Sequence, residues 1–388
     1  MYSHGPRARP ALQVADIFRD HGPDVAQQYP LTPDQRRVLR DVQACRTAAL
    51  GGHLDLCLHC GFSRPAYNSC RNRHCPTCQS VQQAAWIDAR SDKVLPTHHF
   101  HVVFTLPSQF RRLLRDNARV IFDLLFRAAS RTLLTLGEDR LGGQLGITMV
   151  LHTWTRDLRL HPHVHCVVTG GALARGAEPT WTASRPTFLF PIAVMRKLYR
   201  GALLASLDHA RRVGKLILPE DLLPEHCWEA FVLHLRRTKW VVYSKRPFGG
   251  ARQVFEYLGR YTHRVAISSS RLKRVGPDEV VFRTKGDQTA TLHPHDFIRR
   301  FLQHTLPRRF RKIRHYGLLS PSGARHRLEL ARASLGTMST PEPPEPTADD
   351  ILEEARRCPA CDVGRLFRFV MPKGADDSWL PVEFLDSS

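Results

Sequence analysis

The spacing of polar and apolar positions predicts several helical stretches. Thr32 precedes Pro33 and apolar residues follow at helical spacing, so residues 1–50 are expected to be mainly helical, with Thr32 as a cap. Residues 111–136 contain neither proline nor glycine and place arginines opposite an apolar stripe, which predicts a long amphipathic helix. A further helix is expected over residues 191–212.

Short apolar runs bounded by turn residues predict strands. They lie at residues 98–107, 147–157, 158–171 and 240–248, and the second and third are expected to pair as antiparallel neighbours. A helix should cover residues 252–264, and residues 264–270 should pair with residues 278–285. The order of elements predicts an α+β fold, in which helices pack on an antiparallel sheet after a small N-terminal helical region.

Composition suggests three parts along the chain. Residues 1–94 combine the helical region with most of the cysteines, and residues 95–335 hold the predicted sheet and its helices. Residues 336–388 begin with a linker rich in Pro, Glu and Thr at 338–349, which offers little apolar surface to bury. A tail containing Cys358 and Cys361 follows this linker.

Charge narrows the choice of partner. The 388 residues include 57 Lys and Arg against 36 Asp and Glu, which gives a formal net charge of +21. Such an excess favours a polyanion, and nucleic acid is the first expectation. The absence of long apolar runs and of a secretory N-terminal pattern predicts a cytoplasmic protein without a membrane-spanning segment.

The cysteines indicate zinc. Six of the ten form C-x2-C pairs, and the pairs Cys57/Cys60 and Cys75/Cys78 are separated by 14 residues, as in four-thiolate zinc ribbons. We expect these four to form one structural zinc site. Cys70 or His74 could replace one of the ligands. The pair Cys358/Cys361 is half a site, either without metal or completed by ligands distant in sequence.

The segment HPHVHC at residues 161–166 is the first chemical signal. On a strand, His163 and His165 share a face while Val164 enters the core, so the two imidazoles could hold one metal ion. Hydrogen-bonded structural histidines are the alternative interpretation. The third ligand stays open among His152, Gln253 and Glu256.

The segment YLGRYTHR at residues 257–264 is the second signal. Tyr257 and Tyr261 are four residues apart and lie on one face of the expected helix. Such an aromatic pair often serves core packing. Here Arg260 and Arg264 lie beside the tyrosines, which favours phosphate binding instead.

Together these motifs resemble the rolling-circle, two-tyrosine HUH transposases of the insertion sequence 91 family. The cysteine cluster ending in CRNRHCPTCQ, the His motif and the tyrosine motif follow one another in the family's order, and the match covers most of the chain. The HUH pattern falls on His163, Val164 and His165, and the two tyrosines of the family's Y-x3-Y pattern fall on Tyr257 and Tyr261.

The resemblance implies a function. A HUH endonuclease domain would hold Mg²⁺ or Mn²⁺ at His163 and His165, and Tyr257 and Tyr261 would attack single-stranded DNA to form a 5′-phosphotyrosine bond and a free 3′-OH. The protein would thereby drive rolling-circle transposition. Zn²⁺ would be bound at the N-terminal cysteine cluster.

The resemblance also implies partners. These are single-stranded DNA at the element ends and target site, together with host replication proteins, in the bacterial cytoplasm near the nucleoid. Arg71 and Arg73, beside the cysteines, and Arg260 and Arg264, beside the tyrosines, are expected to contact DNA. The basic segment 306–317 could follow a DNA backbone, with Phe310 and Tyr316 as stacking positions, or could be a solvated helix.

Three other functions are compatible with parts of the sequence. A rolling-circle replication initiator or relaxase would use the same two motifs. A tyrosine recombinase would use His209, Arg212 and Tyr243 and would need no metal. A zinc-dependent nucleic-acid binding protein would use the histidines and tyrosines only structurally.

Overall fold

The computed structural model of the protein describes residues 12–78, 94–176, 179–245, 266–336, 357–361 and 363–375. The predicted helix at 252–264 and the predicted linker at 338–349 lie outside these ranges. Within them, no helix combines the length and the apolar character that crossing a bilayer requires.

The main sheet has the strand order β11-β4-β5-β3-β7, and β6 pairs with β5 at its end. Its strands are β3 (His99–Thr105), β4 (Gly143–Trp154), β5 (Leu160–Ala174), β6 (Trp181–Ala183), β7 (Val242–Lys245) and β11 (Ile313–Gly317). All neighbours are antiparallel. The predicted pairing of the strands around residues 147–157 and 158–171 is confirmed, because β4 and β5 pair along most of their length.

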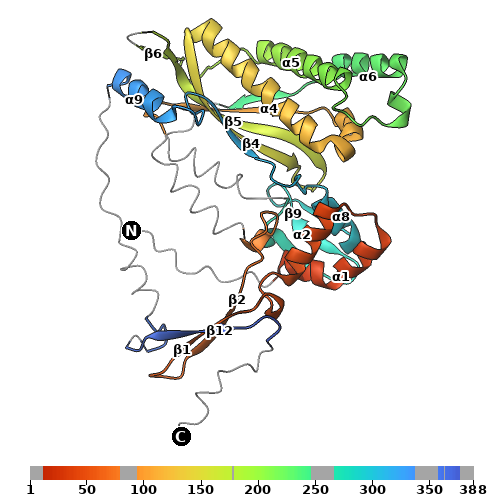
Figure 1. Ribbon diagram of the computed structural model, residues 1–388, viewed down its shortest axis with the longest axis vertical. Coiled ribbons are helices and arrows are strands. Elements are labelled where there is room, and N and C mark those ends of the chain that lie inside the picture. The colour runs from red at the N-terminus through yellow and green to blue at the C-terminus, as the bar shows by residue number, and fades with distance from the viewer. Residues whose placement is uncertain are drawn as a thin grey trace.

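Helices cover one face of this sheet (Figure 1). They are α4 (Arg111–Leu141), α5 (Ile192–Arg212) and α6 (Glu225–Arg237), and the first two confirm the predicted helices. The largest hydrophobic cluster lies between these helices and the sheet, and it includes Phe126 of α4, Leu203 of α5 and Val164 of β5. Cys166 is part of the same cluster, as a small buried side chain.

A second core joins the N-terminal helices to residues far along the chain. Helices α1 (Val14–Gln28) and α2 (Pro33–Ala44) pack near α8 (Pro294–Leu302) and the sheet β8 (Leu272–Val275), β9 (Val280–Arg283) and β10 (Thr289–Leu292). The predicted Thr32 cap is confirmed, since its side chain accepts a hydrogen bond from Gln35 N at 3.3 Å. The strand that pairs with β9 is β8, which begins two residues after the predicted segment 264–270.

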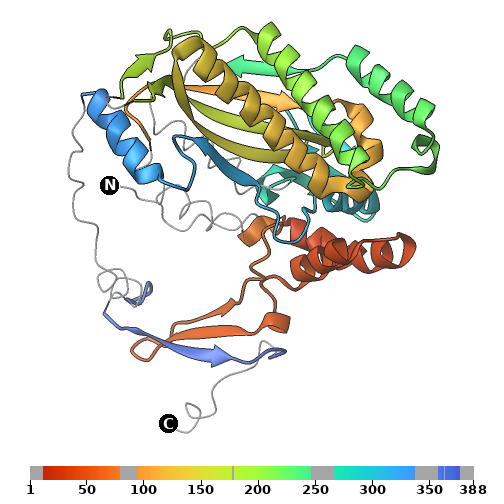
Figure 2. The same cartoon turned by 45° about the horizontal axis from the view of Figure 1, so that its top comes forward.

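A third sheet has the order β12-β1-β2 and consists of β12 (Leu366–Met371), β1 (Gly52–Cys57) and β2 (Ser63–Tyr67). It stands apart from the main sheet and its helices (Figure 2). The C-terminal strand β12 therefore completes a sheet of the N-terminal region, and α1 and α2 share a core with residues 266–302. The second core joins segments from either side of residue 94, and this sheet joins segments from either side of both residue 94 and residue 335.

The remaining regular elements are short. Helix α9 (Ala324–Ser334) packs near the end of the main sheet through Leu328 and Ala331. Within the described ranges, 3₁₀ helices cover Ala48–Leu50, Ser108–Phe110, Glu220–Leu222 and Ser269–Arg271.

Candidate functional site

A cluster of histidines lies on the face of the main sheet opposite α4 and α5. Residues alternate between faces along a strand, so Val164 and Cys166 enter the core while His163 and His165 point the other way. The register pairs His152 of β4 with His163 of β5 and Val150 with His165. One ring nitrogen from each of His152, His163 and His165 lies within 4.8 Å of the others. Of the three open candidates for the third ligand, the described structure places His152 beside the pair.

The protonation states of these rings suit metal binding. Burial lowers the pKa of His163 to about 4 and lowers the pKa of His165 well below its ordinary value, so both are neutral near pH 7. His163 Nδ1 donates to the carbonyl of His161 at 2.6 Å, which leaves Nε2 free as an acceptor. A neutral imidazole nitrogen with a free lone pair is the form that binds metal.

His101 of β3 lies directly beside His165 at the edge of this cluster. Its Nε2 lies 2.8 Å from His165 Nδ1, and the two rings stack with centroids 5.0 Å apart. Burial lowers the pKa of His101 to about 4, so it can accept the hydrogen bond as a neutral ring. A metal ion would bind the other ring nitrogen of His165, Nε2, and His101 would then hold the His165 ring in position. No motif marks His101 in the sequence, because His99 and His101 of the apolar strand β3 do not form a ligand pattern of their own.

The cysteines form two clusters instead of one. The first consists of Cys45, Cys70, Cys75 and Cys78, and the second of Cys57, Cys60, Cys358 and Cys361, with the ligand atoms of each cluster within 4.8 Å of one another. The predicted single site of Cys57, Cys60, Cys75 and Cys78 is therefore wrong in its grouping. Sheet β12-β1-β2 holds Cys57 and Cys60 away from Cys75 and Cys78. Cys358 and Cys361 complete the group around Cys57 and Cys60, whereas Cys45 and Cys70 complete the group around Cys75 and Cys78.

The first cluster lies between the end of α2 and the loop before residue 79. Cys78 Sγ is 3.6 Å from both Cys45 Sγ and Cys70 Sγ, a separation that suits four sulfurs around one tetrahedral ion. Cys45, Cys75 and Cys78 are buried beside the second core. Cys45 has no C-x2-C partner, so no sequence motif marks it. It belongs to this cluster because it lies directly after the end of α2.

His74 and Arg73 have structural roles next to this cluster. His74 Nε2 accepts a hydrogen bond from Leu306 N at 3.0 Å, and its Nδ1 lies 3.0 Å from Asn72 Oδ1, so its ring is not a zinc ligand. Arg73 donates to the carbonyls of Phe310 and Pro307 at 2.6 Å and 2.8 Å. The expectation that Arg73 binds DNA is therefore not supported, because its guanidinium ties this loop to the segment before β11.

Arg71 remains available for a ligand. It is exposed, with a positive φ of 53°, and it lines a surface depression of about 410 Å³ together with Arg46, Asn68 and Ser69. Two arginines and two small polar side chains around one depression offer several donors to a phosphate group.

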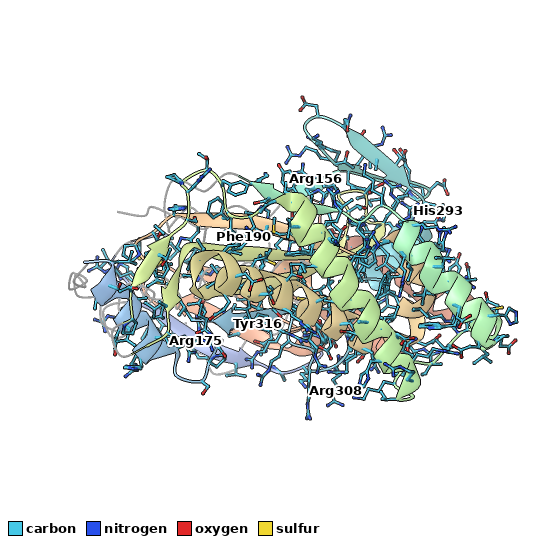
Figure 3. All side chains as sticks on the ribbon, turned by 90° about the horizontal axis from the view of Figure 1, so that it is seen from above. Arg156, Arg175, Phe190, His293, Arg308 and Tyr316 are labelled. Atoms are coloured by element: carbon cyan, nitrogen blue, oxygen red, sulfur yellow. The ribbon has the colours of Figure 1, made fainter. Side chains whose placement is uncertain are left out.

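The structure contradicts the predicted helix in the basic segment 306–317 and the predicted stacking role of Phe310. The last part of this segment is strand β11 at the edge of the main sheet, and Phe310 is buried with its ring centroid 5.7 Å from that of Phe122. Phe310 is thus a core residue and no stacking position for bases. Arg308 is exposed and extends from the edge of the molecule when the helical layer is seen from above (Figure 3).

The tyrosine motif lies outside the described residues. This holds for Tyr257, Tyr261, Arg260 and Arg264, and also for Gln253 and Glu256, the two other candidates for the third metal ligand. Their roles stay predictions from the sequence.

Comparisons with known proteins identify the family. The family described as "Putative transposase" matches residues 146–327, which include the histidine cluster, and the family described as "Transposase zinc-binding domain" matches residues 17–106. No solved structure matches the chain.

Two curated relatives extend these matches over most of the chain. The "Putative transposase y4qJ" of Sinorhizobium fredii is 43% identical over 380 residues, covering 92% of this chain and 95% of that protein. The "Transposase for insertion sequence element IS801" of Pseudomonas savastanoi pv. phaseolicola is 30% identical over 305 residues, covering 73% and 71% respectively. The chain therefore belongs to the transposases of the insertion sequence 91 family and carries their N-terminal zinc-binding domain.

Proposed function

We propose that this transposase cleaves and rejoins single-stranded DNA through a covalent tyrosine intermediate, with a divalent ion bound by His152, His163 and His165. The observation that carries the proposal is the convergence of three histidine nitrogens on the sheet face opposite the helices. His163 remains partly accessible to solvent, so a substrate phosphate can approach this face.

The donor set decides which ion fits. Imidazole nitrogen suits transition-metal ions, whereas Mg²⁺ prefers oxygen ligands. No carboxylate belongs to this histidine cluster among the described residues. Mn²⁺ therefore fits better than Mg²⁺. When bound, the ion would supply Lewis-acid polarisation of the scissile phosphate.

Tyr257 and Tyr261 would be the nucleophiles. A tyrosine has a pKa near 10 and needs help to lose its proton, and the guanidinium groups of Arg260 and Arg264 would favour the phenolate form. The phenolate oxygen would form a bond to phosphorus, while the bond from phosphorus to the 3′ oxygen breaks and that oxygen takes up a proton. The energy of the broken bond is kept in the 5′-phosphotyrosine, so a 3′-OH can later reverse the step on another strand without nucleotide hydrolysis.

The zinc-binding domain would bind DNA as well as hold its own fold together. Zn²⁺ at Cys45, Cys70, Cys75 and Cys78 would fix the loop that carries Arg71, and Arg71 would contact phosphate at the surface depression. The partners would be single-stranded DNA at the element ends and target site, with host replication proteins acting on the released 3′-OH.

An adduct assay tests this function. Single-stranded DNA of the element's own ends, labelled at either end, is incubated with the protein with and without Mn²⁺ or Mg²⁺. We expect a denaturation-resistant adduct on the 5′ side of the cut that requires the ion and disappears in the double variant Tyr257→Phe/Tyr261→Phe. His163→Ala should lower its yield by roughly 100-fold, since Lewis-acid assistance contributes several kcal/mol.

Two control variants separate the alternatives. Tyr243→Phe and His326→Ala change exposed residues outside the histidine cluster and should leave the adduct unchanged. Loss of the adduct in Tyr243→Phe, with a 3′ attachment to duplex DNA that persists in EDTA, would instead indicate a tyrosine recombinase. Binding of DNA without any adduct would indicate a binding protein.

A further inference from the structure

We propose that Cys57, Cys60, Cys358 and Cys361 form a second zinc centre, which joins the C-terminal segment to the N-terminal zinc-binding domain. Neither family match reaches the last two cysteines, because the matches end at residues 106 and 327. This inference concerns a site other than the catalytic cluster, and it stands independently of the tyrosine chemistry.

The sulfur positions agree with one tetrahedral ion. Cys60 Sγ is 3.6 Å from Cys358 Sγ, and Cys57 Sγ is 3.9 Å from Cys361 Sγ. Four sulfurs at the usual Zn–S distance of about 2.3 Å are separated by roughly 3.8 Å along each edge of the tetrahedron. All four cysteines are free thiols in the structure.

Two matching turns hold these sulfurs. In the turn between β1 and β2, Cys57 N donates to Phe62 O at 2.8 Å, and Gly61 N donates to Cys57 O at 2.9 Å. In the turn before β12, Cys358 N donates to Gly364 O at 2.9 Å. Each turn thus closes on its first cysteine and aims two sulfurs at the space between the turns.

Backbone amides also point at the sulfurs of the second turn. Ala360 N lies 3.4 Å from Cys358 Sγ, and Gly364 N lies 3.3 Å from Cys361 Sγ. Such N–H groups stabilise the thiolate form that binds metal. A Cβ atom at Gly364 would lie 2.4 Å from Cys57 Sγ, so only glycine lets the two turns approach this closely.

Ion pairs within the sheet beside this centre hold the two turns close to each other. Asp55 of β1 is 2% exposed, and it pairs with Arg368 of β12 at 2.8 Å and with Arg64 of β2 at 3.1 Å. These pairs set β12 in register with β1, so Leu366 lies opposite Cys57 and the second turn meets the first.

The sheet has little apolar core of its own. Among the residues of its three strands, the buried apolar side chains are Leu54, Cys57 and Met371. A sheet of three short strands with so few buried side chains needs a further source of stability, and a structural metal is a common one. The proposed ion would link residues about 300 positions apart in the chain, since Cys57 and Cys361 are separated by 304 positions.

Zinc content is the first test. Purified full-length protein is analysed for bound zinc by elemental mass spectrometry, next to Cys358→Ser/Cys361→Ser, Cys70→Ser/Cys75→Ser and Cys227→Ser. We expect each double variant to lose about one zinc per chain relative to wild type, because each removes half of a different tetrahedral site. Cys227 belongs to neither cluster, so Cys227→Ser should keep the wild-type content. Unchanged zinc in Cys358→Ser/Cys361→Ser would overturn the proposal.

Thiol labelling of the unmodified protein provides a second test that needs no variant. Cys60 is exposed and Cys361 is half-buried, so without a metal both should react rapidly with an alkylating reagent. We expect both to be protected until a strong zinc chelator is added, whereas the half-buried Cys227 reacts from the start. Rapid labelling of Cys60 and Cys361 before chelation, or disulfide bonds among the four cysteines, would rule out the centre.

Discussion

Histidine shows how strongly the chemistry of a residue depends on its surroundings. His163 and His165 face a shared space on the sheet, whereas His304 is 1% exposed and lies between Thr153 and Leu158. His304 Nε2 donates to Leu158 O at 3.2 Å, and its Nδ1 lies 3.3 Å from Thr153 Oγ1. Burial lowers the pKa of His304 to about 4, so this ring is a neutral part of the core.

The pKa of His304 predicts a loss of stability in acid. An unfolded histidine titrates near pH 6.5, so between pH 6.5 and about 4 the unfolded state binds a proton that the folded state excludes. The stabilising contribution is therefore complete above pH 6.5 and falls as the pH drops through this window, by up to ~3 kcal/mol. His304→Gln keeps a hydrogen-bonding side chain without this titration.

Urea unfolding at a series of pH values measures the effect. The difference in unfolding free energy between wild type and His304→Gln should shrink steadily from pH 7 to pH 4.5. Parallel stability curves for the two proteins over this range would show that His304 does not carry the assigned linkage.

At the scale of elements, two glycines in helices have opposite roles. Gly137 lies in α4 where the helix meets β4, and a Cβ atom there would lie 2.7 Å from Leu145 Cγ. Gly201 lies in α5 with open space around it, since nothing lies within 4 Å of a Cβ atom at that position. The close contact of helix α4 with the sheet thus depends on a residue that lowers intrinsic helix propensity.

A matched pair of alanine variants tests this contact. Gly137→Ala should lower the free energy of unfolding by about 1–2 kcal/mol, because crowding against buried Leu145 outweighs the gain in helix propensity. Gly201→Ala should raise it by up to ~1 kcal/mol, since only the propensity changes. Chemical unfolding followed by circular dichroism measures both, and a stabilising effect of Gly137→Ala would contradict the packing described.

At the scale of the whole molecule, Arg73 and Arg71 differ although they are two residues apart. Arg73 connects the loop of the zinc-binding domain to the segment before β11 through the carbonyls of Leu306, Pro307 and Phe310. Arg71 is exposed beside the surface depression. Arg73 thus stabilises the contact between two parts of the protein, whereas the side chain of Arg71 is accessible to a ligand.

Alanine variants of the two arginines should separate these roles. Arg73→Ala should lower the free energy of unfolding by about 2–3 kcal/mol, because buried carbonyls lose a charged donor. Arg71→Ala should leave stability within about 0.5 kcal/mol and weaken binding of single-stranded DNA, with a reduced dependence on salt. Thermal unfolding and fluorescence anisotropy measure the two effects. Equal DNA affinity for Arg71→Ala and wild type would exclude the proposed contact.

Local patterns were sufficient for the parts of the protein that depend on neighbours in sequence. Helical spacing located α4 and α5, Thr32 and Pro33 marked the start of α2, and strand alternation placed His163 and His165 on one face. Each of these depends on contacts within a few residues, which the order of side chains already specifies.

Tertiary structure alone decided which distant residues meet. The C-x2-C spacing marked Cys57, Cys60, Cys75 and Cys78 as metal ligands, but equal spacing cannot say which pairs share an ion. Strand β12 brings Cys358 and Cys361 next to Cys57 and Cys60, and α2 brings Cys45 next to Cys75 and Cys78. The grouping therefore depends on contacts across the whole chain. His101 could not be predicted for the same reason, because it lies beside His165 only when β3 pairs with β5.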